Sequence, residues 1–151
     1  MSYSTIRDEI KAQLESVTGI GTVHDYRRWA VREDTLAVLF KPAAQAMLHA
    51  WQITRLKTPE EYSSTNKASR RIYTFEIEGI MSHKDADATE RTFQDMVEAI
   101  CAKFRPLYDL NDKAERIVEP IQVEDVGLVY FGDGLCHIAT LTLEVQEQVT
   151  W

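Results

Sequence analysis

The feature that most constrains the fold is an amphipathic stretch at residues 87–105, DATERTFQDMVEAICAKFR. Apolar side chains recur there every three or four residues, which places them on one face of an α-helix. This stripe comprises Phe93, Met96, Val97, Ile100, Cys101 and Phe104. Asp87 and Glu90 have the spacing of a capping box, and Pro106 marks the far end of the helix. A stripe this wide must be buried, and the strand-like segments before and after it are the elements that can bury it.

Those segments show the two-residue alternation of β-strands. Residues 47–57 and 70–81 flank a polar stretch at 58–69, which predicts a long hairpin with an extended loop at its tip. Residues 117–123 contain Pro120 and predict an edge strand, because proline cannot donate to a strand ladder. Residues 126–131 and 135–149 predict two more strands, joined at the tight-turn signal Gly132-Asp133-Gly134.

The N-terminal third combines helical and strand patterns. Residues 5–18 predict a helix that is capped by Thr5 and Asp8 and ends at Gly19. Residues 22–31 predict a strand at an edge or partly exposed, and residues 35–40 a short helix capped by Asp34. Residues 43–46 fit either a helix extension or a loop. With 151 residues and 44% apolar side chains, the chain suits one domain.

The prediction is therefore a single α+β domain over residues 1–151. Its sheet is mixed and mainly antiparallel, with long hairpins, and is packed by one long central helix and an N-terminal helix. The formal net charge of −7 argues against a general nucleic-acid or anionic-membrane binder. The N-terminal residues lack the apolar core of a signal peptide, and no apolar run is long enough to span a membrane. We expect a soluble protein made inside the cell.

Catalytic and ligand-binding patterns are weak. Gly19-Ile20-Gly21 follows a helix and lacks a third glycine, so it predicts a turn and not a phosphate loop. Cys101 and His137 could form a nucleophile pair, but Cys101 lies on the apolar stripe, which favours core packing. Trp51 and Tyr73 among basic residues are compatible with base stacking, although pairing inside the core explains them better. The remaining candidates are Glu76 with Glu78 and Glu124 with Asp125, which favour a solvated face, and His24, His49 and His83, which lack metal-ligand spacing.

We therefore expect no enzyme activity, no cofactor and no metal site. The charge distribution gives the one candidate surface. Residues 55–71 hold five basic and two acidic side chains, a net charge of +3, whereas residues 112–151 hold eight acidic and two basic side chains, a net charge of −6. A basic hairpin tip and an acidic sheet suit contacts between subunits, although a solvated surface is an equal alternative. The predicted interface residues are Arg55, Lys57, Lys67, Arg70 and Arg71.

The order of elements resembles the tail-terminator family of long-tailed bacteriophages, also described as tail-completion or minor tail proteins. The resemblance rests on the helix at residues 6–14, the HDYRRW strand at 24–29, the helix at 36–40, the AWQITR strand at 50–55 and the closing CHIATLTLEV strand at 136–145. It extends over nearly the whole chain and consists of pattern and element order, without a catalytic signature.

This resemblance implies a virion structural protein that is made in the bacterial host cytoplasm and assembles as a ring, typically six-fold. The ring would cap the head-proximal end of the tail tube, end tube polymerisation and present a surface to the head–tail connector. Its partners would be copies of itself, the tail tube protein and the connector, with no sequence-specific nucleic acid and no membrane. Two alternatives remain: a head–tail connector or neck protein, and a small-molecule-binding or enzymatic α+β domain.

Overall fold

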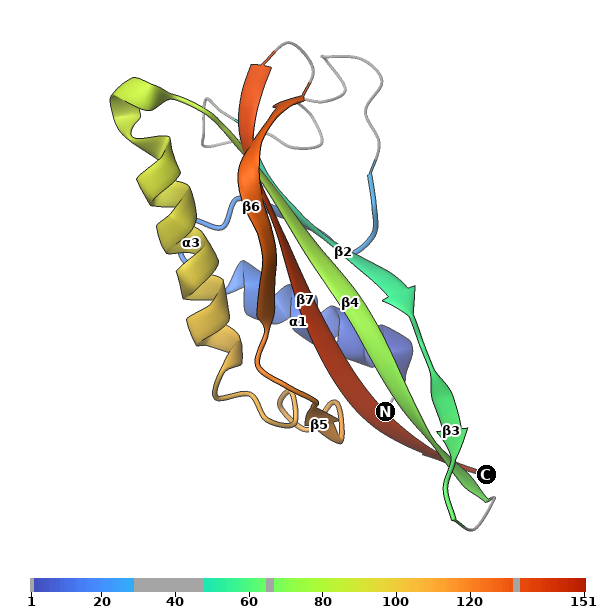
Figure 1. Cartoon of the computed structure of the whole chain (residues 1–151). Helices are drawn as coiled ribbons and strands as arrows, with labels where there is room; N and C mark the ends of the chain where they lie inside the picture. The colour runs from blue at the N-terminus through green and yellow to red at the C-terminus, as the bar shows by residue number, and fades with distance from the viewer. Residues whose placement is uncertain (1, 29–47, 65–66, 132–133) are drawn as a thin grey trace.

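The computed structural model describes residues 2–28, 48–64, 67–131 and 134–151 (Figure 1). It confirms an α+β fold, with two α-helices and a mixed, mostly antiparallel sheet in these ranges. The helices are α1 (Tyr3–Glu15), the 3-10 turn η1 (Asp85–Asp87) and α3 (Thr89–Phe104). The strands are β1 (Thr22–His24), β2 (His49–Lys57), β3 (Glu60–Tyr62), β4 (Ala68–Ser82), β5 (Arg116–Ile117), β6 (Gln122–Phe131) and β7 (Gly134–Thr150).

The strand order is β1-β2-β4-β7-β5, with β3 also pairing with β4 and β6 also pairing with β7. Only the β1–β2 pair is parallel among the described strands. Strands β4 and β7 pair along fifteen consecutive positions, from Ala68 opposite Thr150 to Ser82 opposite Cys136. This pair forms the axis of an elongated molecule, with the β3 end and the chain's C-terminus at one extremity (Figure 1).

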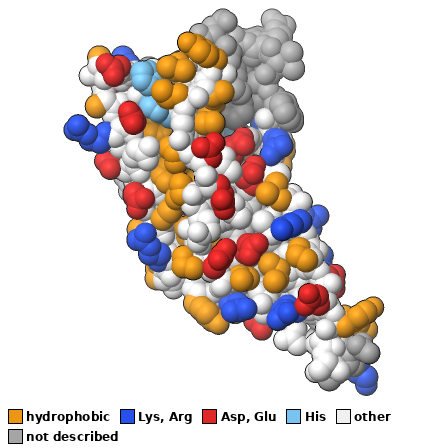
Figure 2. Space-filling view, in the orientation of Figure 1, with side chains coloured by type: hydrophobic (Ala, Val, Ile, Leu, Met, Phe, Trp, Pro, Cys, Tyr) orange, Lys and Arg blue, Asp and Glu red, His pale blue; other side chains and the backbone are white. Residues whose placement is uncertain are grey.

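The core lies on one face of this sheet. The odd-numbered residues of β4 and β7, from Tyr73 to Ile77 and from Ala139 to Val145, join the buried side of α1 and α3 in one apolar cluster. The even-numbered residues face the opposite way, and most are polar and partly exposed. No helix of the described chain packs on that second face, where acidic side chains gather over the middle of the sheet (Figure 2).

The apolar stripe predicted for residues 87–105 is confirmed, since all six of its members are buried in α3. The predicted capping box is wrong. The N-cap is Ala88, which has a positive φ of 51° and no capping side chain, while Asp87 belongs to η1 and forms an ion pair with Lys84 at 3.1 Å. Ala88 turns the chain into α3 through a left-handed backbone conformation, and its methyl side chain cannot accept the hydrogen bond that a serine or aspartate N-cap accepts.

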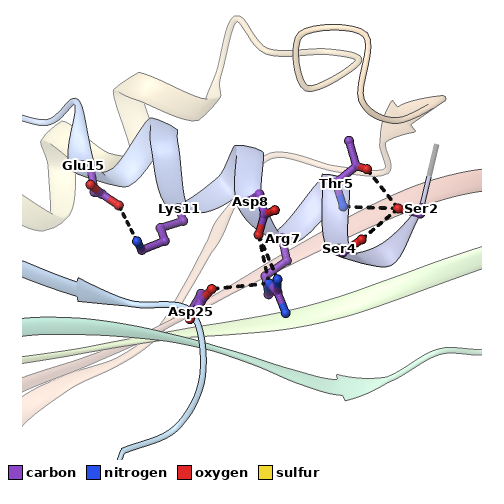
Figure 3. A network of polar contacts seen from close by, with 8 residues as sticks. All are labelled: Ser2, Ser4, Thr5, Arg7, Asp8, Lys11, Glu15 and Asp25. Atoms are coloured by element: carbon purple, nitrogen blue, oxygen red, sulfur yellow. Dashed lines mark hydrogen bonds and ion pairs between the residues drawn. The ribbon is translucent and has the colours of Figure 1, made fainter.

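Helix α1 begins two residues before the predicted start. Its N-cap is Ser2, whose hydroxyl accepts a hydrogen bond from the Thr5 amide, so the predicted Thr5 and Asp8 cap is wrong (Figure 3). Ile6, Ile10 and Leu14 are fully buried, as the spacing predicted. On its exposed side, Arg7 contacts Asp8 at 2.9 Å and Asp25 at 3.6 Å. These contacts tie the first turns of α1 to the segment that follows β1 (Figure 3).

Strand β1 is an edge strand, but it ends at His24, so the strand predicted for residues 22–31 is too long. The next residues are held by side chains and not by a ladder: Arg27 forms an ion pair with Glu76 at 3.2 Å, and the Arg28 amide donates to Gln52 at 3.0 Å. The helix predicted at 35–40, its Asp34 cap, the ambiguous residues 43–46 and the last residues of the predicted strand lie outside the described residues.

Two further predictions are corrected in the second half of the chain. The extended loop predicted for 58–69 contains β3, which pairs back onto the start of β4. The single strand predicted for 117–123 is two strands, β5 and β6, because Pro120 interrupts the ladder. Strand β6 continues to Phe131, which lies opposite Gly134. Residues 132–133 of the predicted turn lie outside the described residues.

One glycine is required by packing. Trp51 is fully buried and lies opposite Gly79 in the β2–β4 register. A Cβ atom at position 79 would come within 2.5 Å of the Trp51 ring. The indole also packs edge-on against Phe93 of α3, with ring centroids 5.7 Å apart. The absence of a side chain at Gly79 therefore leaves room for the Trp51 ring, which packs between β4 and α3.

Candidate functional site

Three of the predicted basic residues, Lys67, Arg70 and Arg71, lie at one extremity of the sheet. This extremity is called here the tip and is defined as residues 58–64, 67–71 and 148–151, where β3, the start of β4 and the end of β7 lie side by side (Figure 1). Arg55 and Lys57 lie at the end of β2, opposite Phe75 and Thr74 near the middle of β4. A backbone hydrogen bond joins the C-terminal residue to the rest of the tip, since the Trp151 amide donates to the Lys67 carbonyl at 3.2 Å. The structure thus brings Lys67, Arg70 and Arg71 together at the tip, and it gives the five predicted residues different environments.

Arg70 and Arg71 are paired within the tip. They lie opposite Glu61 and Glu60 in the β3–β4 register, and each forms an ion pair with its cross-strand neighbour, at 3.0 Å and 3.4 Å respectively. Opposite charges facing each other across strands stabilise a pairing by tenths of a kcal/mol to about 1 kcal/mol. Part of the polar segment predicted as a loop is therefore a strand, Glu60–Tyr62, and these ion pairs favour its register against β4.

Arg55 and the two lysines complete the predicted set. The Arg55 guanidinium lies over the Tyr3 ring of α1, 4.3 Å from its centroid, which is a cation–π contact. Lys57 and Lys67 are exposed, and neither forms an ion pair with a described residue. Of the five side chains, these two lysines are therefore the most available to a partner.

Behind the arginines lies a buried polar pair that sequence reasoning missed. Glu147 is on the core side of β7, almost without exposure, and accepts a hydrogen bond of 2.7 Å from the Tyr73 hydroxyl. Burial and this bond to Glu147 raise the pKa of Tyr73 to about 12. Arg71 lies opposite Glu147 in the register, and its guanidinium lies 5.1 Å from the centroid of the Tyr73 ring. Arg71 thus contributes to the core as well as to the surface.

We predict that Tyr73→Phe lowers the free energy of unfolding by about 1–3 kcal/mol, because the buried Glu147 carboxylate loses its donor. Tyr62→Phe is the matched control, since Tyr62 is exposed, and it should change stability by less than about 0.5 kcal/mol. Urea unfolding of both variants measures the difference. Equal stabilities for the two variants would contradict the role given to the Tyr73–Glu147 bond.

The tip also carries an exposed aromatic pair that the sequence analysis did not identify. Tyr62 is 75% exposed and Trp151 66% exposed, and their rings meet edge-on with centroids 6.1 Å apart. Beside Tyr62 and Arg70 lies a hollow of about 320 Å3, lined also by Ser63, Ser69, Glu115, Gln146 and Gln148. The two rings come together because β3 and the end of β7 both pair with the start of β4, so no local sequence pattern predicts the contact.

The acidic surplus of the C-terminal third does not form one surface. Glu147 is buried, Glu144 is half-buried and accepts from Thr74, and Glu115 accepts a hydrogen bond from Gln146. The exposed carboxylates without an ion pair to a described residue include Glu119, Glu124 and Asp125, which lie just before and within β6. These three belong to the edge of the sheet that is remote from β3.

The Cys101–His137 pair does not form. His137 is buried next to the start of α3, where its Nε2 lies 2.9 Å from the Thr89 hydroxyl and its ring lies 5.0 Å from that of His83. Cys101 lies three helical turns further along α3, about 18 Å at the rise of an α-helix. Burial raises the pKa of the Cys101 thiol. Cys101 is therefore a core residue.

His49 gives the fold a dependence on pH. It is buried, accepts a hydrogen bond of 3.3 Å from the Trp51 indole, and burial lowers its pKa to about 4. In the unfolded chain the His49 side chain binds a proton below about pH 6.5, whereas in the folded chain it binds one only near pH 4. The stability that the neutral, buried His49 contributes is therefore fully present above pH 6.5 and is lost as the pH falls toward 4.

The expected contribution of His49 is at most about 1.4 kcal/mol per pH unit across that window. Urea unfolding between pH 7 and pH 4 measures it, with His49→Gln as the comparison. An unchanged slope in His49→Gln would show that other groups cause the pH dependence.

The other sequence candidates are resolved by burial. Trp51 and Tyr73 have no exposed surface, so they cannot stack on bases. Glu76 and Glu78 lie on the second face of the sheet, bound to Arg27 and Gln52 respectively. Within the described ranges, no three His, Cys, Asp or Glu side chains gather as a metal site would require. No helix in those ranges has the length and apolar character needed to cross a bilayer.

Comparison with known proteins returned no match, either to a protein-family model or to a curated protein sequence.

Proposed function

We propose that this protein is a structural component of a bacteriophage tail, which caps the head-proximal end of the tail tube as a ring of identical subunits. The ring ends tube polymerisation and presents a surface to the head–tail connector. In this proposal the protein is located in the virion, and its partners are other copies of the chain, the tube protein and the connector. Arg55, Lys57, Lys67, Arg70 and Arg71 contribute to a contact surface.

The observation that carries the proposal is the placement of exposed apolar side chains at both extremities of the sheet. Tyr62 and Trp151 lie at the tip, and Leu128, Val129 and Tyr130 lie at the far end of β6. Figure 2 shows hydrophobic side chains gathered at these two places. Contiguous exposed apolar groups mark interaction sites, and a subunit with one at each end suits an assembly of many copies.

The resemblance in element order supports the same function. Among the described residues, α1 includes the helical stretch at residues 6–14, β2 includes the AWQITR stretch, and β7 includes the CHIATLTLEV stretch. In this proposal the antiparallel pairs β2–β4 and β6–β7 correspond to the long hairpins of the family, and α3 corresponds to its long central helix.

Locating the protein in the particle tests this assignment against the head–tail connector alternative. We expect an epitope tag, detected with gold-labelled antibody, to mark the head-proximal end of tails, including tails from a strain that makes no heads. A label that stays on tailless heads instead would favour the connector. A label found in neither structure would exclude a virion role.

A further inference from the structure

The tip and the edge strand β6 both expose aromatic side chains, and they expose charges of opposite sign. We infer that the tip of one copy docks against the β6 edge of a second copy, where the β6 edge is defined as residues 119–130. This inference rests on the proposed function, because it assigns the two surfaces through which copies of the chain would join into a ring.

The first argument is charge. The tip holds three basic and two acidic side chains, a net charge of +1, and residues 119–130 hold three acidic side chains and no basic one, a net charge of −3. On the tip, Arg70 and Arg71 form ion pairs with Glu61 and Glu60, which leaves Lys67 exposed and without an ion pair to a described residue. On the β6 edge, Glu124 and Asp125 are exposed and form no ion pair with a described residue. Unpaired charges of opposite sign on two surfaces direct their encounter and fix their register.

The second argument is apolar area. On the β6 edge, Tyr130 is 77% exposed, and Val123, Leu128 and Val129 are exposed as well. The tip presents Tyr62 and Trp151, and Tyr62 also lines the 320 Å3 hollow together with Arg70. Tryptophan, tyrosine and arginine are the residue types that most often dominate binding energy at protein interfaces. Each surface therefore combines exposed aromatic side chains with at least one exposed charged side chain.

The third argument is geometry. Strand β6 pairs only with β7 among the described strands, so no described strand covers its outer edge. Tyr130 pairs with Leu135 of β7. Tyr62 pairs with Ser69 of β4, which in turn pairs with Val149 of β7. The fourteen residues between these positions span roughly 45 Å of β-strand. The two surfaces cannot meet within one copy, so contact between them joins one copy to the next and gives a head-to-tail arrangement, which closes when its rotation suits a ring.

The test traps this contact covalently, since a ring interface can be weak without the tube end as a template. The two natural cysteines are buried. We would purify Thr150→Cys and Gln122→Cys variants, which leave the aromatic and charged residues of the tip and of the β6 edge in place, mix them in equal amounts and treat them with a short bismaleimide. The matched control replaces Thr150→Cys with Thr92→Cys, because Thr92 is an exposed threonine of α3 outside both surfaces. We expect dimer from the Thr150→Cys and Gln122→Cys mixture and little from either variant alone or from the control mixture.

Charge reversal provides the second arm. Lys67→Glu or Glu124→Lys, each built into the cysteine variants, should lower the yield of cross-linked dimer by about tenfold, as a loss of ~1.4 kcal/mol would. Both reversals together should restore most of the yield, which a fold defect would not allow. Thermal unfolding of each variant checks that the fold is intact.

Three outcomes would overturn the inference. Rings seen by electron microscopy with cross-links only between like positions would leave the proposed function standing and refute this pairing of surfaces. Equal yields from the control mixture would mean random collision. No cross-link at any concentration, on or off tail tubes, would assign the tip to a different partner.

Discussion

Replacing Phe93 by alanine is expected to lower the free energy of unfolding by ~3–5 kcal/mol, the largest single effect that the structure predicts. Phe93 is almost fully buried on α3, and its ring packs edge-on against Trp51 at 5.7 Å and against His137 at 5.6 Å. It therefore joins the helix to β2 and to β7 at once. Truncation leaves a cavity between elements that are separately fixed by the sheet, so the site cannot collapse to fill it.

Urea unfolding of Phe93→Ala measures this loss. Tyr108→Ala is the control, because it removes an exposed ring and should cost less than about 0.5 kcal/mol. A loss below about 1 kcal/mol in Phe93→Ala would mean that the contact between α3 and the sheet does not hold the domain together.

Replacing Gly79 by alanine is expected to cost about 3 kcal/mol, at the upper end of what overpacking a core usually costs. The added Cβ atom would lie 2.5–2.6 Å from three atoms of the Trp51 ring. Trp51 has no exposed surface and is held between Gly79 and Phe93, so the ring cannot move away without displacing α3. Strand β4 is equally fixed, because it pairs with β2 on one side and β7 on the other.

Gly127→Ala is a closely matched control, since a Cβ atom there would have no atom within 4 Å. Gly127 also lies in a strand, so the two substitutions share their effect on the unfolded chain, a gain of ~0.4–1 kcal/mol. We therefore expect a large loss at position 79 and no loss at position 127. Similar stabilities for the two variants would show that the strand or the Trp51 ring shifts at little cost to make room for the added methyl group.

The elements that could be predicted from sequence are those with a strong internal period. The apolar stripe of α3 repeats over three helical turns, which predicts a helix. Leu141, Leu143 and Val145 alternate with polar residues, which predicts a strand, and both predictions are confirmed. The N-caps of α1 and α3 could not be predicted, because a capping-box motif can be placed at more than one position near the start of a helix. At α3 the decision depends on Ala88, whose left-handed conformation no side-chain pattern encodes.

The tip could be predicted in part. Its charge was visible in sequence, but the pairing of Glu60 and Glu61 with Arg71 and Arg70 turned a predicted loop into β3. That complementarity of two short charged runs could have been noticed. The Tyr73–Glu147 bond and the Tyr62–Trp151 contact could not, because each joins residues more than seventy positions apart. Such contacts depend on how far β7 extends along β4.

The double role of Arg71 affects how the tip should be tested. Its contacts with Glu60 and the Tyr73 ring, and its position opposite Glu147, make it part of the fold. Reversing its charge would place three carboxylates in one row across β3, β4 and β7, so a loss of assembly in such a variant would have two explanations. Lys67 and Glu124 are exposed and without an ion pair to a described residue, which makes their reversal informative about contacts between copies.

The proposed capping role is tested most directly by tail length in particles made without this protein. Electron microscopy of a strain that lacks the chain should show headless tails of irregular or excessive length. Supplying the wild-type protein should restore tails of one length joined to heads. Tails of normal length attached to heads in the absence of the protein would contradict the account.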